Sequence, residues 1–499
     1  MKTDAENLFF DIMAAMSENV SKRNYNRRLF ALCGLAGLMY GIDVGLIAAA
    51  LPYIKATCSF TEAQLSGIVA AVLLGCVPGT FFASLTAERF GRLAAFRVTA
   101  AVFAVAVPLI CFSDGNFCLM FSGRILQGVG CAFVGIAAPL YMAECAGACE
   151  RGRGTGMMQL VLTVGLVLAA LVGMAVVGIL GSAEDPDVPL AAKNLAWRSI
   201  FWFSAVPAAF LYAGTFFLRE SPRWLFGKGR IEEARLSLLA NSEPAVAEAI
   251  LAELAANAEN ERAVACGGNG GGRSLVSLMR RRYVVPFLLA FAVACFNQGT
   301  GINSLLNYSV VMFQKAGLSG AAANVADTVV KVANFAMTVV ALFLVDRRGR
   351  RFLLSFGTLG AAAGLVLAGA SFLAVEHGLF VAGTAAGIAV AAGVVVFVGA
   401  FAVGPGVCAW LALSELMPLR IRAKGMMLAG FGSMFVSWAI AQAFLPWSRA
   451  FGESSVFFTL SGIAALYFLT VRLALPETKG RSLEEIERSF AEGEKENGE

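Results

Sequence analysis

The sequence of 499 residues has little charge, since Asp, Glu, Lys and Arg make up 15% of it, against about 25% in a soluble globular domain. So little polar surface cannot cover a water-exposed body, which excludes a soluble multidomain enzyme, a disordered chain and a nucleic-acid-binding protein. Only one histidine is present, His377, which excludes a metal site built from several histidines. The 11 cysteines form no CxxC pair, and we expect reduced, buried thiols. We therefore expect no metal, no cofactor and no enzyme activity.

Hydrophobic residues are abundant at 58%, and the mean hydropathy is +0.73. This composition indicates a polytopic membrane protein, because about 20 apolar residues are needed for each crossing. Residues 1–28 are polar and end in a basic cluster, so we expect no cleaved signal peptide. Twelve spans are predicted, at 29–54, 63–87, 93–112, 117–143, 155–180, 198–218, 284–313, 322–345, 352–375, 379–413, 423–446 and 454–474.

Lys and Arg gather in alternate loops between these spans and in the polar stretch 219–282. Because positive loops stay in the cytoplasm, both termini and this stretch are expected there. The prediction is an all-α membrane protein with two six-helix bundles. Its parts are a cytoplasmic N-terminal segment (1–28), a first bundle (29–218), a cytoplasmic helical linker (219–282) with a helix near 231–258, a second bundle (283–475) and a cytoplasmic tail (476–499). We expect a monomer in the lipid bilayer of the plasma membrane.

The two halves repeat each other at matching cytoplasmic loops. ERFGR at 88–92 follows the second span, and DRRGR at 346–350 follows the eighth, an offset of 258. The pair of Glu144 and Arg151 after the fourth span recurs after the tenth, at an offset of 271. Such parallel repeats are typical of transporters.

Each repeated loop places a carboxylate beside Arg at a helix end. Snorkelling cations that anchor the helices would explain the Arg residues but not the carboxylates. We therefore favour interhelical ion pairs that close the cytoplasmic face while the outer face is open. The expected gate residues are Glu88, Arg89, Arg92, Glu144, Arg151 and Glu220 in the first half, and Asp346, Arg347, Arg350, Glu415, Arg422 and Glu477 in the second.

A set of motifs along the chain resembles the sugar porter family of the major facilitator superfamily. The motifs are ERFGR (88–92), GR (123–124), ESPRWL (220–225), NQGTGIN (297–303), DRRGRR (346–351) and PETKGRSLEEI (476–486). The resemblance implies a carrier of a hexose, another aldose or a cyclic polyol such as myo-inositol. It also implies a central site between the two bundles.

Asp43 is an acid inside an otherwise neutral first span, and Arg124 lies in the fourth. Counted from the outer helix ends, they lie about 16 Å and about 10 Å deep, so a buried pair is geometrically feasible. A static salt bridge is one interpretation. The other is proton coupling, in which separation from Arg124 lets Asp43 take a proton. In the resembled family an acid at this place marks proton symporters, which favours symport for Asp43.

The seventh span carries a cluster of amides, with Asn297, Gln298, Asn303 and Asn307 around two glycines. Hydrogen bonds between helices are one explanation. Amides that donate and accept near a helix break are also good partners for hydroxyl groups, so we favour polyol binding. The resemblance matches Gln298 and Asn303 to sugar-binding positions, with Asn297 where Gln is usual and Asn307 where Tyr is usual.

The resemblance carries three further binding positions, Gln159, Asn334 and Trp410, the last after a Gly-Pro-Gly break that could hinge the tenth span. Asp327 and Lys331 form an i,i+4 pair in the eighth span that the family does not lead us to expect. Outward snorkelling of Lys331 is slightly favoured over a place in the outer vestibule.

The expected function is uptake of a sugar or polyol with a proton by alternating access. Passive facilitation by the same fold is the alternative, and a transporter-like nutrient sensor is a weaker one.

Overall fold

The computed structural model describes the backbone of residues 2–145, 151–267, 281–417 and 422–477. Side chains are described except at 2–23, 151–156, 257–258, 260–267, 281–283, 346 and 422–424. All regular structure in these residues is helical, and twelve helical segments are long and apolar enough to cross a membrane. The all-α fold with twelve membrane helices is therefore confirmed.

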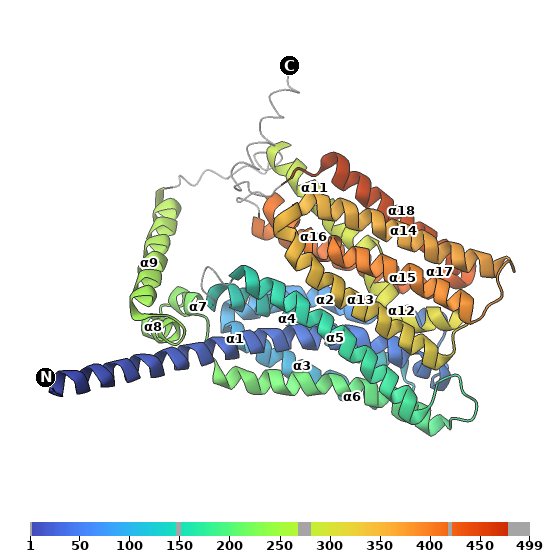
Figure 1. Ribbon diagram of the computed structural model, residues 1–499, viewed down its shortest axis with the longest axis horizontal. Coiled ribbons are helices and arrows are strands. Elements are labelled where there is room, and N and C mark those ends of the chain that lie inside the picture. Colours follow the sequence, from blue (N-terminus) through green and yellow to red (C-terminus); the bar gives the residue numbers. More distant parts are fainter. Residues whose placement is uncertain (1, 146–150, 268–280, 418–421, 478–499) are drawn as a thin grey trace, which may run out of the picture.

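The helices form two bundles joined by short linker helices (Figure 1). The first bundle contains α1 (Lys2–Thr57), α2 (Glu62–Phe90), α3 (Arg92–Cys111), α4 (Phe117–Cys145), α5 (Arg151–Leu180) and α6 (Leu190–Gly214). The linker helices are α7 (Pro222–Gly227), α8 (Ile231–Leu239) and α9 (Pro244–Gly267). The second bundle contains α11 (Arg281–Gly299), α12 (Ile302–Lys315), α13 (Gly320–Arg348), α14 (Arg350–Glu376), α15 (Thr384–Val403), α16 (Pro405–Leu416), α17 (Arg422–Phe451) and α18 (Glu453–Ala474). We call the end with α7–α9 the linker end and the opposite end the far end.

Two membrane crossings are broken where the sequence predicts a break. The seventh crossing is split between α11 and α12 at Gly301, whose φ of +79° is a left-handed conformation that favours glycine. The tenth is split between α15 and α16 at Gly404, and Pro405 opens the second half without a need for its missing N–H. Both breaks free main-chain groups near the middle of the molecule.

Close helix contacts inside the first bundle depend on small residues. A Cβ atom at Gly41 of α1 would overlap the main chain of α5 at Leu162, and one at Gly75 of α2 would overlap α4 at Ile125. With hydrogen in place of a side chain, the backbones approach closely enough for dispersion forces to hold the pair. These seams fix the position of α1, which carries Asp43.

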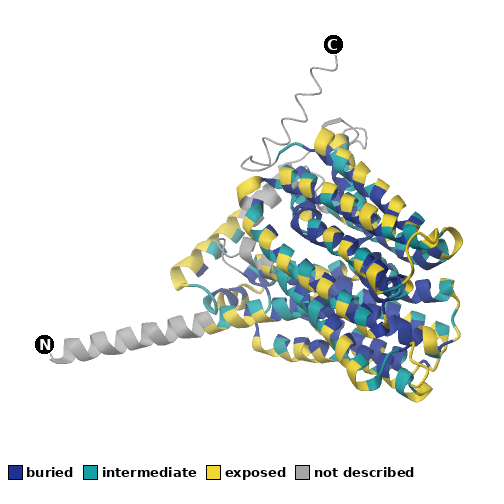
Figure 2. Ribbon diagram, turned by 45° about the vertical axis from the view of Figure 1, so that its right-hand side comes forward, coloured by how far each residue is buried: buried dark blue, intermediate teal, exposed yellow. Residues whose placement is uncertain are grey.

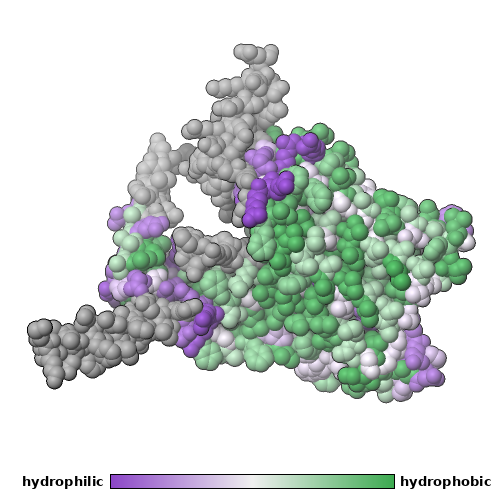
Figure 3. Space-filling view, viewed as in Figure 1, coloured by the Kyte–Doolittle hydropathy of each residue, from purple (hydrophilic) through white to green (hydrophobic). Residues whose placement is uncertain are grey.

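The surface of the described residues has an apolar belt between two polar ends (Figure 3). Large apolar side chains such as Phe81, Phe210, Phe343 and Phe356 are exposed on it. An exposed band of this size suits a lipid environment. Buried residues lie instead along the inward faces of the helices (Figure 2).

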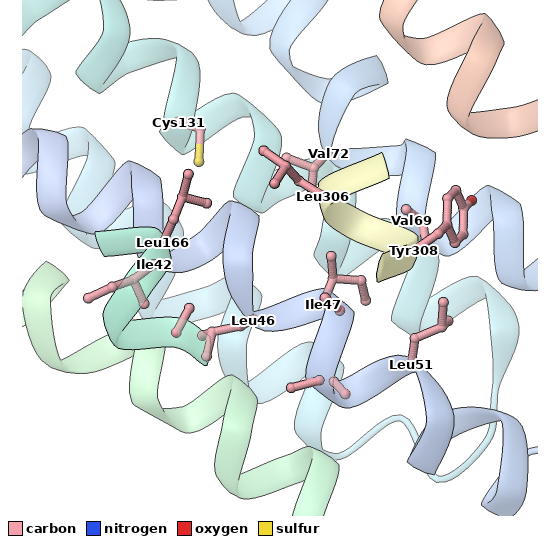
Figure 4. Packing of buried hydrophobic residues seen from close by; sticks show 14 of the residues in the cluster. Ile42, Leu46, Ile47, Leu51, Val69, Val72, Cys131, Leu166, Leu306 and Tyr308 are labelled. Atoms are coloured by element: carbon pink, nitrogen blue, oxygen red, sulfur yellow. The ribbon is translucent and has the colours of Figure 1, made fainter. Parts of the chain in front are cut away.

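The two bundles meet along α1 with α12, α2 with α17 and α5 with α13. Figure 4 shows side chains from α1, α2, α4, α5 and α12 packed in one apolar cluster. Among the described residues, two hydrogen bonds cross between the bundles, from Lys331 to the Gly45 carbonyl at 3.2 Å and from Gln442 to the Ala63 carbonyl at 3.3 Å. Both lie in the half of the molecule nearer the far end, so the bundles are held together there.

Some predicted boundaries are wrong. The sixth span was expected from residue 198, but α6 begins at Leu190, because Arg198 pairs with Asp114 and its guanidinium lies over the Trp197 ring, so it does not end the helix. The helix expected near 231–258 is two helices, α8 and α9. Pro244 starts the second of them, since it cannot donate to a preceding turn.

Candidate functional site

Asp43 of α1 and Arg124 of α4 lie together in the first bundle, both 1% exposed. The Nη1 atom of Arg124 is 4.0 Å from Oδ1 of Asp43, a distance that gives charge attraction without a hydrogen bond. The Oδ1 atom has no hydrogen-bond partner, and Oδ2 accepts a weak bond from the Cys131 thiol at 3.5 Å. The pair is therefore loose in this conformation.

Arg124 is held by groups other than Asp43. Its Nη1 donates to Gln127 Oε1 at 2.8 Å, and its Nε lies 3.4 Å from the Ile68 carbonyl of α2. Gln127 in turn donates to Ser204 of α6 at 3.4 Å, and the Arg124 guanidinium lies 5.5 Å from the Phe201 ring centre. Arg124 can thus lose Asp43 as a partner and keep part of its hydrogen bonding.

The sequence analysis did not name these supporting residues. Gln127 could have been found, because it follows Arg124 by three positions and so shares its helix face. Ser204 and Cys131 carry no such signal, since their proximity depends on how α6 and α4 pack against the others.

The amides of the seventh crossing gather at the break between α11 and α12. The Nδ2 atom of Asn303 is 2.9 Å from Gln298 Oε1 and 2.9 Å from Ser437 Oγ of α17. The side-chain oxygens of Asn297 and Asn307 are buried and accept no hydrogen bond from the described protein. Buried oxygens of this kind are costly unless a ligand or water donates to them.

Tyr308, next to Asn307, supports the cluster from behind. Its hydroxyl donates to the Ala441 carbonyl of α17 at 2.8 Å, and its ring stacks on Phe444 with centres 4.7 Å apart. These contacts fix the rotation of α12 and so the direction of the Asn303 and Asn307 side chains.

Three other predicted binding residues make no hydrogen bond to this cluster within the described chain. Gln159 of α5 is partly buried, and Asn334 of α13 is 9% exposed. Trp410 of α16 is 41% exposed, so no protein group covers much of its ring. Their part in binding stays a prediction.

The repeated motif of the first half forms one compact ion-pair cluster at the linker end. Arg92 binds Glu144 through two hydrogen bonds of 2.8 and 2.6 Å. The Glu220 carboxylate accepts from the main-chain N–H groups of Arg92 and Leu93 at 2.9 and 3.0 Å, and so caps the start of α3. Ser221 adds a hydrogen bond to Glu144 at 2.5 Å.

The second half repeats this geometry. Arg350 lies 3.1 Å from Glu415, and Glu477 accepts from the main-chain N–H groups of Arg350 and Arg351 at 3.1 and 3.3 Å. Each cluster stays within its own bundle. The charged ends of the bundles are thus tied internally and not to each other.

The remaining gate residues are placed differently. Glu88 and Arg89 are exposed and form no ion pair with a described residue, so this structure does not support them as a gate pair. The Arg347 side chain is exposed at the same end. The side chains of Arg151, Asp346 and Arg422 lie outside the described residues.

The expected snorkelling of Lys331 is wrong. Lys331 and Asp327 are both fully buried, with 2.8 Å between Nζ and Oδ2. Their burial follows from the docking of α13 against α12 and the first bundle, which a single helix pattern does not reveal.

Comparison with known proteins places this arrangement in context. The family model described as Sugar (and other) transporter matches residues 30–490. Polyol transporter 5 of Arabidopsis thaliana is 27% identical over 94% of this chain and 87% of its own. The arabinose-proton symporter of Bacillus subtilis (strain 168) is 28% identical over 91% of this chain and 93% of its own.

Among solved structures, the fold is similar to the partially occluded inward open conformation of the xylose transporter XylE from E. coli. The TM-score is 0.77 at 22% identity, covering 92% of this chain and all of the other.

Proposed function

The chain belongs to the Sugar (and other) transporter family, the sugar porters of the major facilitator superfamily, and from that premise we propose that it carries a hexose or cyclic polyol together with a proton. Transport proceeds by alternating access, with the two bundles rocking about a site between them.

The observation that carries the proposed cargo is the pair of buried, unpartnered oxygens on Asn297 and Asn307. Both need a hydrogen-bond donor, and a hydroxyl group both donates and accepts. The amide of Gln298, partnered by Asn303, lies at the same helix break. An uncharged molecule with several hydroxyl groups matches this set, and glucose, another aldose and myo-inositol all satisfy it.

Asp43 supports the proposed proton coupling. Its carboxyl is buried, and its attraction to Arg124 acts across 4.0 Å without a hydrogen bond. A carboxyl released from its cation is stable in a buried site only as the neutral acid. A cycle that loosens and tightens this pair would therefore take up one proton and release it. The name of the bacterial symporter relative agrees with such coupling.

The proposed orientation has the linker end in the cytoplasm, because the loops at that end carry most of the Lys and Arg residues. Both termini are then cytoplasmic, and the protein works as a monomer in the plasma membrane. The cross-bundle hydrogen bonds near the far end then close the outer side, which makes this conformation inward-facing. The clusters of Arg92 and Arg350 are proposed to form the cytoplasmic gate when the bundles rock back.

The test is uptake into proteoliposomes of radiolabelled D-glucose, D-xylose, L-arabinose, sorbitol and myo-inositol, with and without an inward proton gradient. We expect one or more of them to accumulate above the external concentration only when the gradient is present. Uptake that equilibrates and ignores a protonophore would instead support passive facilitation. No uptake of any compound would contradict the proposed cargo class.

A further inference from the structure

A second buried ion pair, separate from Asp43 and Arg124, lies in the second bundle. Lys331 Nζ is 2.8 Å from Asp327 Oδ2, and the Ser309 hydroxyl of α12 donates to Asp327 Oδ1 at 2.5 Å. Both carboxylate oxygens of Asp327 are therefore satisfied inside the bundle. A pair bonded this completely keeps its charges neutralised without help from the first bundle.

Lys331 makes one further bond, and that bond leaves the bundle. Its Nζ donates to the Gly45 carbonyl of α1 at 3.2 Å. Gly45 follows Asp43 by two residues on the same helix. The four residues Ser309, Asp327, Lys331 and Gly45, which we call the latch, thus join α12, α13 and α1.

We propose that the latch holds the outer side closed, and that its Lys331–Gly45 bond breaks each time that side opens. The proposal rests on the alternating access described above but not on the identity of the cargo or on proton coupling. A ligand or contact shifts a two-state equilibrium only if it differs between the states. The Asp327–Lys331 bond lies within one bundle and persists in both states, whereas the bond to Gly45 exists in one.

The geometry explains why Lys331 does not simply follow α1 when the bundles separate. Asp327, one helical turn away on α13, holds the ammonium group, and Ser309 holds Asp327. The Gly45 carbonyl belongs to the backbone of α1 and moves with the first bundle. In the opened state the Lys331 ammonium gains water in place of the carbonyl, and the pair lines the outer vestibule.

The latch also reaches the proposed binding site. Ser309 lies on α12, the same half-helix that carries Asn303 and Asn307. A displacement of α12 by cargo would therefore be felt at Asp327. This connection gives the outer gate a direct mechanical link to the amides.

The experiment measures distances between spin labels at Ser59 and Ala450, two exposed far-end positions on different bundles. The labels are attached to non-natural side chains, because Cys118 is an exposed thiol. No sugar and no pH gradient are present, so the result is independent of the transport assay. The test variant is Asp327→Asn/Lys331→Met, which removes both charges together and leaves neither unpaired.

We expect the ratio of outer-open to outer-closed molecules to rise roughly tenfold or more in this variant, as for the loss of a hydrogen bond to a charged group. Asp327→Asn/Lys331→Gln keeps a donor at position 331 and should shift the ratio less. The matched control is Lys315→Gln/Glu453→Gln, a far-end pair at 2.5 Å inside the second bundle, which should leave the ratio unchanged. A folded test variant with the wild-type distance distribution would overturn the proposal.

A measurement on the unmodified protein covers the case in which the variants do not fold. In proteoliposomes, an impermeant amine reagent added outside should modify Lys331 slowly, whereas the exposed Lys55 reacts at once. Modification of Lys331 that stays absent while the protein transports would contradict its exposure on opening.

Discussion

Replacement of Asp43 by Asn is the sharpest test of proton coupling. Asn has nearly the same shape but carries no dissociable proton, so substrate movement would lose its link to the proton gradient. Among the described membrane helices the other buried carboxyl, Asp327, is bonded by Lys331 and Ser309. Asp43, with an unpartnered Oδ1, is left as the carboxyl free to change protonation. We therefore expect one proton per cycle.

A stoichiometry of one sets the magnitude. A gradient of one pH unit is worth about 1.4 kcal/mol, which supports roughly tenfold accumulation of an uncharged sugar. The Asp43→Asn variant should bring this ratio to about one while exchange of labelled for unlabelled sugar continues. Arg124 keeps its bonds to Gln127 and the Ile68 carbonyl, so we expect the variant to fold.

The assay compares uphill uptake and equilibrium exchange in the same proteoliposomes, with the amount of protein measured in each. The control is Asp327→Asn/Lys331→Met, which also removes a buried carboxyl but should keep accumulation. An Asp43→Asn protein that still accumulates sugar about tenfold would refute the coupling role assigned to this residue.

Three other changes follow from the structure. Asn307→Val removes a buried oxygen proposed to accept from the cargo, so KM should rise about fivefold for one lost hydrogen bond while the melting temperature stays near wild type. Gly41→Leu places a side chain against the main chain of α5 at Leu162, and gel filtration should show little monodisperse protein. Arg92→Gln leaves Glu144 without its bidentate partner, and the melting temperature should fall by several degrees, as for about 2 kcal/mol; an unchanged value would mean that the pair contributes nothing in this conformation.

The sequence identified the linker-end clusters better than it identified their roles. The repeated motifs name Arg92, Glu144 and Glu220 as neighbours because each motif recurs in the second half. They do not reveal that Glu220 caps α3 through main-chain N–H groups. That contact depends on how the chain turns after α6, and no local pattern encodes it.

The amides of the seventh crossing were likewise predictable as a group, since they are clustered along one short segment with two glycines. Which of them are bonded to each other was not predictable. Asn303 is occupied by Gln298 and by Ser437, which comes from α17 far along the chain, whereas the oxygens of Asn297 and Asn307 are left without a partner.

The amino-acid sequence alone determined the number of crossings, the duplication and the breaks at Gly301 and Gly404, because hydropathy and backbone chemistry act within a single segment. Only the tertiary structure decided that Arg124 stays 4.0 Å from Asp43 and that Lys331 turns inward to reach the Gly45 carbonyl. Those contacts join side chains on different helices, and their distances depend on how far the helices are tilted and how closely they pack, which follows from the summed contacts of the whole molecule.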